Sequence, residues 1–264
     1  HPTSIVATAT AELVYINCNH NRLEHSIGVA ALAEKLCQKI RKTQPGLKCT
    51  AKDVLCVQLA GLMHDLGHGP FSHAFEDFVK EAHPKYLAKH PELQKLYENE
   101  KWPQHPADWS HEQASLMMID AALAHLGLAI DLDHLDEPLK QIGDGVAARS
   151  IRALDDGDGN DEGLILTSRD MVFVKECIWG EPIPDLEAKL GEGFHGRREE
   201  YQDWLYDIVS NRHSGLDVDK VDYFARDKRR ALRESGEIDK VMVEEAVVAW
   251  AACTDTGHCF RCKN

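Results

Sequence analysis

A strongly apolar helix that ends in two ionisable side chains is the feature that most constrains how this chain folds. Apolar residues recur at helical spacing in TAKDVLCVQLAGLM (50–63), and this segment runs directly into His64 and Asp65. Charged groups at the end of a core helix are costly to bury unless something binds them. Gly67, Gly69 and Pro70 follow closely, so the chain must turn there. The sequence therefore predicts a polar centre at the end of a core helix.

Histidines and aspartates from three distant segments match such a centre. His25 lies in HNRLEHS, the pair His64 and Asp65 lies in GLMHDLGHGPFSH, and Asp219 lies in LDVDKVDYFARD. Two imidazoles and two carboxylates form a mixed nitrogen and oxygen ligand set. Such a set suits a hard or borderline divalent metal ion, whereas a structural zinc site usually has thiolate ligands.

Cationic side chains accompany these candidate ligands. Arg22 precedes His25 by three residues, so a planar anion-binding group lies one helical turn from a candidate ligand. Lys220 directly follows the aspartate of the third segment and can reach the same cavity. A divalent ion beside arginine and lysine is an arrangement that suits phosphoryl chemistry, because the cations offset developing negative charge.

Two further motifs add polar side chains at helical spacing. Asp219, Tyr223 and Asp227 follow one another at intervals of four, so they share one face of a helix. His111 and Glu112 have two interpretations. They can form an acid/base dyad, or they can be an ordinary first-turn pair in which the helix dipole favours the carboxylate.

Helical periodicity dominates the chain and predicts an all-α fold around one core. The expected helices cover residues 25–42, 50–63, 71–79, 110–125, 168–179, 199–211 and 217–234. Thr50 with Asp53, and Ser110 with Gln113, have the spacing of N-terminal capping boxes. We expect a single domain over 1–264.

Its expected parts are a core at about 14–235, a surface excursion at 81–108, an acidic loop at 131–163, and an incomplete C-terminal extension at 236–264 with a short β element near 248–262. Residues 131–163 carry ten Asp or Glu against three Lys or Arg, which is typical of a solvated loop. DDGDGNDEG (155–163) could instead bind calcium, but it lacks the EF-hand spacing.

Charge and composition exclude several classes of function. The net charge of −14, without a basic stripe, argues against nucleic-acid binding. No run of 18 apolar residues predicts a membrane-spanning helix, and the N-terminus lacks the pattern of a secretory signal. Eight scattered cysteines, with Cys37 and Cys56 in apolar helical patterns, point to an intracellular protein, cytoplasmic or nuclear. Because the sequence begins with His1 and has no initiator Met, we expect it to be a piece of a longer protein.

The order H…HD…D, with GLMHDLGHGPFSH, SHEQ and DVDKVDYFARD, resembles the HD-domain superfamily of metal-dependent phosphohydrolases. More narrowly, the chain is similar to the deoxynucleoside triphosphate (dNTP) triphosphohydrolases that combine a sterile-alpha-motif domain with an HD domain. The similarity covers roughly residues 14–80, 109–120 and 205–230. It implies that water attacks the α-phosphorus of a dNTP and releases a deoxynucleoside and inorganic triphosphate.

The resemblance also implies roles for individual residues. The implied ligands of one divalent ion (Fe, Mn, Zn or Mg) are His25, His64, Asp65 and Asp219, and the substrate phosphates can carry a second ion, Mg²⁺. His111 is the implied catalytic residue, Glu112 orients it, and His73 donates a proton to the leaving oxygen. The implied substrate contacts are Arg22, His68, Lys220, Tyr223 and Asp227. The implied partners are a nucleoside triphosphate and, for a longer protein, further copies in a dimer or tetramer.

Two alternatives remain open. An HD-type phosphodiesterase or nucleotidase would share the metal centre but hold two ions, for which His68, His73 and His111 could supply ligands. A non-catalytic nucleotide-binding paralogue would keep the metal site alone. This second alternative is motivated by TATAELVYINC (8–18), which lacks the Gln-Leu and glycine-rich segment that the family uses there for the deoxyribose.

Overall fold

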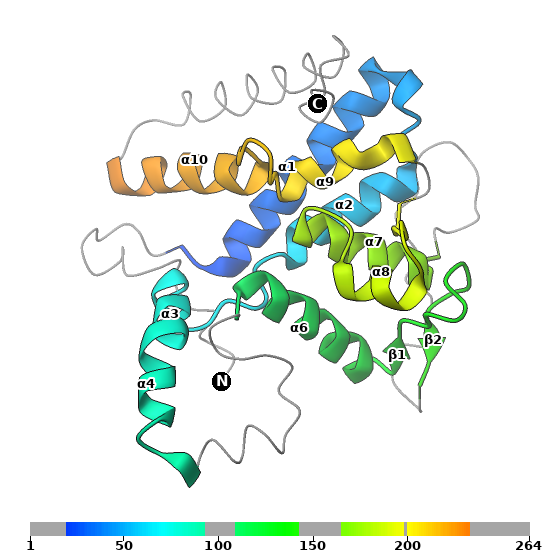
Figure 1. Ribbon diagram of the computed structural model, residues 1–264. Helices are drawn as coiled ribbons and strands as arrows, with labels where there is room; N and C mark the ends of the chain where they lie inside the picture. Colours follow the sequence, from blue (N-terminus) through cyan, green and yellow to red (C-terminus); the bar gives the residue numbers. More distant parts are fainter. Residues whose placement is uncertain (1–19, 93–108, 143–164, 198–199, 233–264) are drawn as a thin grey trace.

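The computed structural model describes residues 20–92, 109–142, 165–197 and 200–232. Helices dominate these ranges, so the predicted all-α fold is confirmed (Figure 1). Within them the only strands are β1 (Leu128–Ala129) and β2 (Lys140–Gln141), which pair antiparallel and were not predicted. The β element expected at 248–262 lies outside the described residues.

The core forms where α1 (Arg22–Thr43), α2 (Ala51–Met63), α7 (Ser168–Trp179) and α9 (Tyr206–Val209) pack together (Figure 1). Its buried side chains include Leu36, Cys37, Cys56, Val57, Phe173 and Ile208. The two cysteines are buried, as the apolar patterns around them predicted. α1, α2 and α7 match the expected helices closely, because each carries an apolar stripe that only this core can cover.

Local hydrogen bonds fix the starts of α2 and α7. At α2, Thr50 Oγ1 accepts from the Asp53 N–H at 3.1 Å, and Asp53 Oδ2 accepts from the Thr50 N–H at 2.8 Å. Thr167 and Asp170 form the same capping box at α7. Lys52 Nζ lies 2.7 Å from Asp170 Oδ2, so an ion pair also joins the two helix starts. These boxes satisfy backbone donors that a helix start leaves free.

α10 (Val218–Leu232) lies across the first turns of α1. A Cβ on Gly28 would lie only 2.0 Å from Asp222 Oδ1, so the missing side chain is what lets the helices approach this closely. Arg226 pairs with Asp222 and also donates to the Glu24 carbonyl oxygen at 3.0 Å. The contact places the acidic face of α10 against the segment that carries the first histidine motif.

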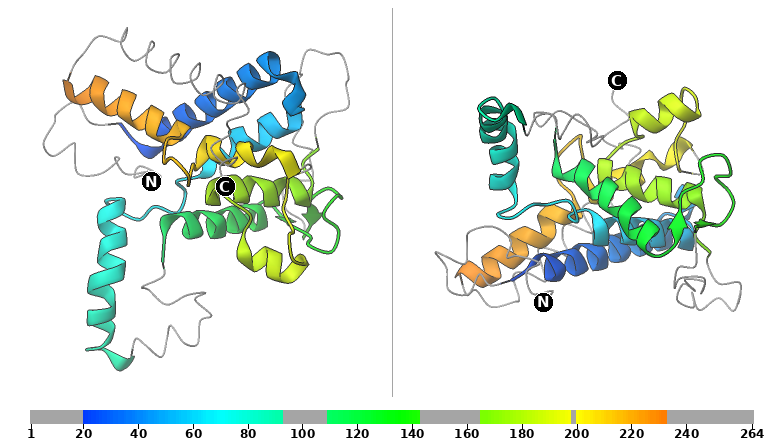
Figure 2. Two further views of the ribbon diagram at one scale, coloured as in Figure 1. Left: turned by 45° about the horizontal axis from the view of Figure 1, so that its top comes forward. Right: turned by 90° about the horizontal axis from the view of Figure 1, so that it is seen from below.

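A helical arm projects from the core (Figures 1 and 2). It consists of α3 (His73–Asp77), a π-helical turn (Phe78–Ala82) and α4 (His83–Leu87), and none of its residues is buried. Residues 81–92, the described part of the surface excursion expected at 81–108, are all exposed or half-buried. The helix α4 was not predicted there; Pro84 lies in its first turn, where the missing N–H loses no hydrogen bond.

α6 (His111–His125) follows the arm along the chain and packs against α7. It begins with Ser110 as its cap, since Ser110 Oγ accepts from the Gln113 N–H at 3.3 Å. The return bond of the predicted capping box is not formed, because Gln113 Oε1 is buried without a hydrogen-bond partner among the described residues. No helix within the described ranges has the length and apolar character needed to cross a membrane.

Two expectations in the second half of the chain need correction. The helix expected at 199–211 is a 3₁₀ segment, Glu200–Leu205, followed by the short α9. α8 (Pro184–Leu190) was not predicted. A further 3₁₀ turn, Pro45–Leu47, joins α1 to α2. Most of the acidic loop expected at 131–163, including 155–163, lies outside the described residues.

Candidate metal centre and imidazole cluster

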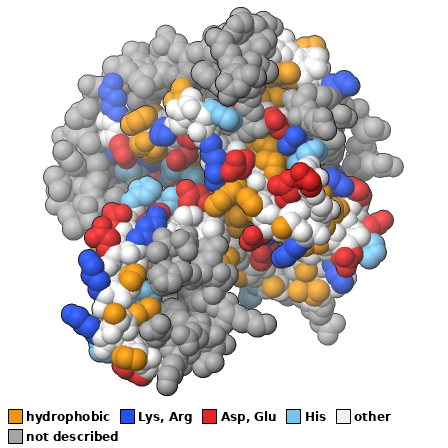
Figure 3. All heavy atoms as spheres, viewed as in Figure 1, with side chains coloured by type: hydrophobic (Ala, Val, Ile, Leu, Met, Phe, Trp, Pro, Cys, Tyr) orange, Lys and Arg blue, Asp and Glu red, His pale blue; other side chains and the backbone are white. Residues whose placement is uncertain are grey.

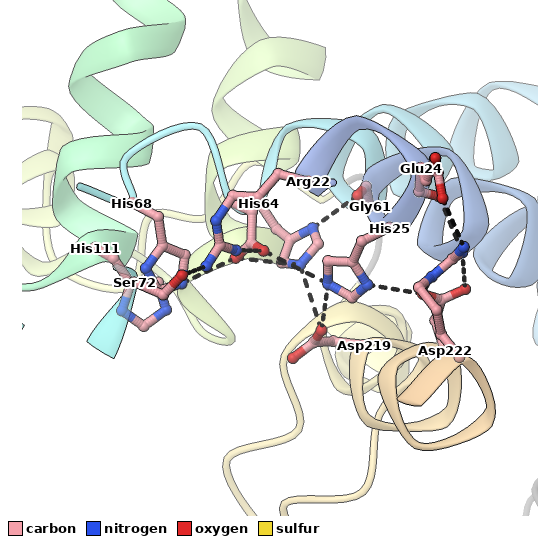
Figure 4. Close-up of polar contacts among 12 residues, drawn as sticks. Arg22, Glu24, His25, Gly61, His64, His68, Ser72, His111, Asp219 and Asp222 are labelled. Carbon is pink, nitrogen blue, oxygen red and sulfur yellow. Dashed lines mark hydrogen bonds and ion pairs between the residues drawn. The ribbon is translucent and has the colours of Figure 1, made fainter. Parts of the chain in front are cut away.

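The four predicted metal ligands converge where the start of α1, the end of α2 and the start of α10 meet (Figure 4). We name His25, His64, Asp65 and Asp219 the mixed cluster. Ligand atoms of the first three lie within 4.8 Å of one another. Asp219 Oδ1 lies 2.9 Å from His25 Nε2 and 3.5 Å from His64 Nε2. Figure 3 shows histidine side chains in a recess with acidic and basic side chains at its rim.

Contacts at the far nitrogen of each ring orient the two imidazoles. His25 Nδ1 lies 2.7 Å from Asp222 Oδ2, and His64 Nδ1 donates to the Gly61 carbonyl oxygen at 2.8 Å. With Nδ1 as the donor, Nε2 of a neutral ring carries the lone pair. His64 Nε2 is buried and has no hydrogen-bond partner. A buried acceptor nitrogen beside carboxylates fits a divalent metal ion.

The charges in the mixed cluster shift one another's titration. Burial alone would lower the pKa of His25, but its bonds to Asp219 and Asp222 outweigh burial and raise that pKa to about 9. Burial would raise the pKa of Asp65, but the neighbouring imidazoles and the Arg22 guanidinium hold that pKa well below its usual range. The carboxylates are therefore ionised, and a metal ion bound here would displace a proton from His25.

A second group of side chains, the imidazole cluster, consists of His68, His73 and His111. The rings of His68 and His111 stack at 3.9 Å between centroids, and His73 packs edge-on against both at 5.0 and 5.3 Å. One ring nitrogen from each lies within 4.8 Å of the others. His68 Nε2 lies 3.3 Å from Asp65 Oδ1, so this contact joins the two clusters.

Carboxylates lie on both sides of His111. Its Nδ1 is 2.9 Å from Glu76 Oε2, and its Nε2 is 3.4 Å from Glu112 Oε1. Burial would raise the pKa of Glu76, but contacts with Lys80 and His111 lower it, so this carboxylate is an ionised acceptor. Glu112 was expected to orient His111. The shorter contact is with Glu76, which sequence reasoning missed.

Residues 22–142 match the family model described as HD domain. This part of the chain is similar to HD domains. The match contains the imidazole cluster and the mixed cluster except Asp219, which α10 brings to the HD domain from outside the matched range.

Curated relatives carry more specific names. The chain is 35% identical over 215 residues to the bovine (Bos taurus) deoxynucleoside triphosphate triphosphohydrolase SAMHD1, covering 81% of this chain and 28% of the relative. The human (Homo sapiens) protein of the same name is 36% identical, with 81% of this chain and 26% of the relative covered. A putative HD domain-containing protein of Acanthamoeba polyphaga mimivirus is 38% identical over 231 residues, covering 82% of this chain and 34% of the relative. The chain thus spans about a third or less of the length of these relatives.

The turn after the HD doublet packs closely against α6. A Cβ on Gly67 would lie 2.2 Å from the Ser115 backbone nitrogen and 2.3 Å from the His111 carbonyl oxygen. Ser115 Oγ accepts from the Gly67 N–H at 2.8 Å and donates to the His64 carbonyl oxygen at 2.5 Å. These contacts set the distance between the two clusters of the HD domain.

The predicted phosphate-binding cations contact the protein itself. Arg22 donates through Nη1 to Asp65 Oδ2 and through Nη2 to Ser72 Oγ. The Lys220 ammonium donates to the Gly215 carbonyl oxygen in the loop before α10. Arg22 therefore lies beside both clusters, while Lys220 lies at the edge. Their roles toward a substrate stay predictions.

The other predicted substrate contacts lie along α10. The ring of Tyr223 is half-buried, and its pKa is raised by burial first and then by the charges of Asp219, Asp217 and Asp227. Asp227 is exposed, and its Oδ1 lies 3.1 Å from Nε2 of the buried His20. The face expected from the spacing of Asp219, Tyr223 and Asp227 is therefore intact, and their roles also stay predictions.

Asp222 and Glu76 are the orienting residues that sequence reasoning missed. Each lies three positions after a residue that was singled out, Asp219 and His73, so helical spacing could have found them. Ser115, which holds the turn to α6, carries no such signal, because its partners are backbone atoms.

Proposed function

We propose that this chain hydrolyses dNTPs to a deoxynucleoside and inorganic triphosphate. One observation carries the proposal. The mixed cluster, whose side chains are of the types that bind metal ions, contacts the imidazole cluster, whose side chains can transfer protons, through Asp65 and His68. The names of the SAMHD1 relatives supply the substrate class.

The side chains fit a division of labour. His25, His64, Asp65 and Asp219 would hold one divalent ion, which when bound polarises a phosphoryl oxygen and acidifies a water molecule. Fe, Mn, Zn and Mg are all compatible with this ligand set. Arg22 and Lys220 would donate to the phosphate oxygens and offset their charge. Tyr223 and Asp227 would line the nucleoside side, and His68 would contact the phosphates.

Hydrolysis requires two proton movements. Water attacks the α-phosphorus and gives up a proton, the bond from phosphorus to O5′ breaks, and O5′ must gain a proton to leave as the deoxynucleoside. His111 Nδ1 is engaged by the Glu76 carboxylate. The other ring nitrogen, Nε2, lies near Glu112 and is the one that would exchange a proton. His73 packs against His111 and is the proposed donor to O5′.

Chromatography of the products tests the proposal. We expect the chain, incubated with each dNTP and Mn²⁺ or Mg²⁺, to release equal amounts of deoxynucleoside and triphosphate. A His64→Ala/Asp65→Ala double variant should release neither, because it loses half of the mixed cluster.

His134→Ala is the matched control, since this histidine side chain is 68% exposed and lies on the surface between β1 and β2. It should retain wild-type turnover. The proposal is wrong if wild-type chain that carries metal releases no triphosphate from any dNTP, with or without GTP as an activator.

A second candidate is a phosphodiesterase or nucleotidase with two metal ions. The observation that favours it is the imidazole cluster, whose three ring nitrogens are close enough to hold an ion of their own. Elemental analysis separates the two candidates. One metal ion per chain supports the triphosphohydrolase, whereas two per chain, reduced to one by His73→Ala, support the binuclear enzyme.

A further inference from the structure

The turn that leads into α3 contains two consecutive residues with positive φ that are not glycine. Phe71 has φ +65°, and Ser72 has φ +57° with ψ −122°. Residues with a Cβ rarely adopt this backbone region, because it brings the Cβ close to backbone atoms. Such strain persists only where the surroundings enforce it, and it gathers at functional sites.

The strained backbone directs the Ser72 hydroxyl inward. Ser72 is buried at 4% exposure, and its Oγ accepts a hydrogen bond from Arg22 Nη2 (Figure 4). Phe71, by contrast, is 56% exposed, so burial of its ring does not explain the conformation. Glycine would adopt this backbone freely but has no hydroxyl. The strained backbone therefore serves to place the Ser72 hydroxyl where it accepts the hydrogen bond from Arg22.

Arg22 is held at two points, one in the mixed cluster and one next to the imidazole cluster in sequence. Nη1 donates to Asp65 of the mixed cluster, whereas Nη2 donates to Ser72, whose carbonyl oxygen accepts from the Phe75 N–H at 3.0 Å and so begins α3. α3 carries His73 of the imidazole cluster. A guanidinium has five N–H donors, and these two contacts leave three for a ligand.

We propose that Ser72 is a positioning residue that fixes the Arg22 guanidinium between the two clusters, so that its remaining donors are set to bind the triphosphate of the substrate. This inference rests on the proposed function for the identity of the ligand. Fixing one side of a planar donor group removes conformational freedom that binding would otherwise have to restrict.

Calorimetric titration of the metal-loaded chain with inorganic triphosphate tests the role of Ser72. Ser72→Gly removes the hydroxyl and also the strain, so it should unfold at the same or a higher temperature while its affinity falls about tenfold, the effect of losing one charge-assisted hydrogen bond. Ser72→Ala should lose similar affinity and unfold at a lower temperature, because it keeps the strain without the hydroxyl.

A double-mutant cycle gives a readout that a merely structural role would not change. In an Arg22→Gln background, Ser72→Gly should weaken triphosphate binding no further. In turnover, Ser72→Gly should raise KM about tenfold and change kcat less than about twofold, because the lost interaction serves ground state and transition state alike.

The outcomes separate this inference from the proposed function. Equal triphosphate affinities of the wild type and Ser72→Gly overturn the role of Ser72, whether or not dNTPs are cleaved. A wild type that binds triphosphate more tightly than Ser72→Gly but cleaves no dNTP supports the role of Ser72 and overturns the proposed function. A wild type that binds no triphosphate overturns the role of Ser72, whereas the proposed function is then decided by whether dNTPs release triphosphate.

Discussion

Buried carboxylates in this protein titrate in opposite directions according to their partners. Burial opposes the charge of Asp65, yet adjacent cationic groups keep its pKa well below the usual range. Glu176 on α7 is also buried, and its Oε2 accepts from the Tyr206 hydroxyl at 2.6 Å and the Gly196 N–H at 2.8 Å, whereas its Oε1 has no hydrogen-bond partner within the part of the chain that the structure describes. Burial therefore dominates and raises the pKa of Glu176 to about 7.

The raised pKa makes stability depend on pH. The folded state binds the Glu176 proton more tightly than the unfolded state, whose pKa is near 4.5. This contribution is fully present below pH 4.5 and is lost as pH rises through about 7, with a total of about 3 kcal/mol. In denaturant unfolding, Glu176→Gln should therefore gain stability relative to the wild type between pH 5 and pH 8.

Glu192→Gln provides the control, because this exposed glutamate lies in the loop after α8. The difference in unfolding free energy between it and the wild type should stay constant over the same pH range. A constant difference for Glu176→Gln as well would show that Glu176 does not titrate with a raised pKa.

At the scale of elements, the site depends on how closely the turn after α2 approaches α6. The Gly67 Cα lies against the backbone of α6, and Ser115 ties the turn to that helix through two hydrogen bonds. Backbone atoms cannot move aside as the end of a long side chain can. The spacing of the mixed and imidazole clusters therefore depends on a position that only glycine fits.

Gly67→Ala should separate the turn from α6. We expect a loss of about 1–3 kcal/mol in the free energy of unfolding and a larger fractional loss of dNTP turnover, because His64 and His111 move apart. Urea denaturation and a steady-state assay measure the two effects.

Gly46→Ala is the matched control, since a Cβ there has no atom within 4 Å and the residue is exposed in the turn between α1 and α2. It should change stability by no more than about 0.5 kcal/mol. Equal effects of the two substitutions would contradict the close approach at Gly67.

Sequence patterns predicted elements well where local chemistry decides them. The capping boxes at Thr50 and Ser110, and the apolar stripes of α1 and α2, gave helices close to those observed. α4 and α8 were not predicted, and each has proline in its first turn, where it is tolerated.

The same limit applies to the site. The ligands of the mixed cluster were predicted because they lie in dense motifs. The contacts of His25 with Asp222 and of His111 with Glu76 join positions 197 and 35 residues apart. Only tertiary packing decides such pairs, so composition and spacing could suggest the residues but not the partners.

For the molecule as a whole, the mixed cluster lies where α1, the end of α2 and α10 meet. An ion held there would bridge α1, the end of α2 and α10, so it should stabilise the folded state by mass action. We expect removal of metal by a chelator to lower the melting temperature by about 5–10 °C, and Mn²⁺ or Mg²⁺ to restore it.

The His64→Ala/Asp65→Ala variant serves as the comparison. Its melting temperature should be the same before and after chelation, because it retains only two of the four ligands. If neither the chelator nor added metal changes the melting temperature of the wild-type chain, this result would contradict a metal site in the mixed cluster.

The long separation of His25 from Asp222 also has a consequence during synthesis. At ribosomal rates, roughly 10–40 s pass between the emergence of these two residues, which are 197 positions apart. During that interval α1, α2 and α7 can already assemble, whereas His25 and His64 still lack the carboxylates of α10. The helical core of the nascent protein would therefore form before the mixed cluster is complete. The last described helix, α10, would complete that cluster.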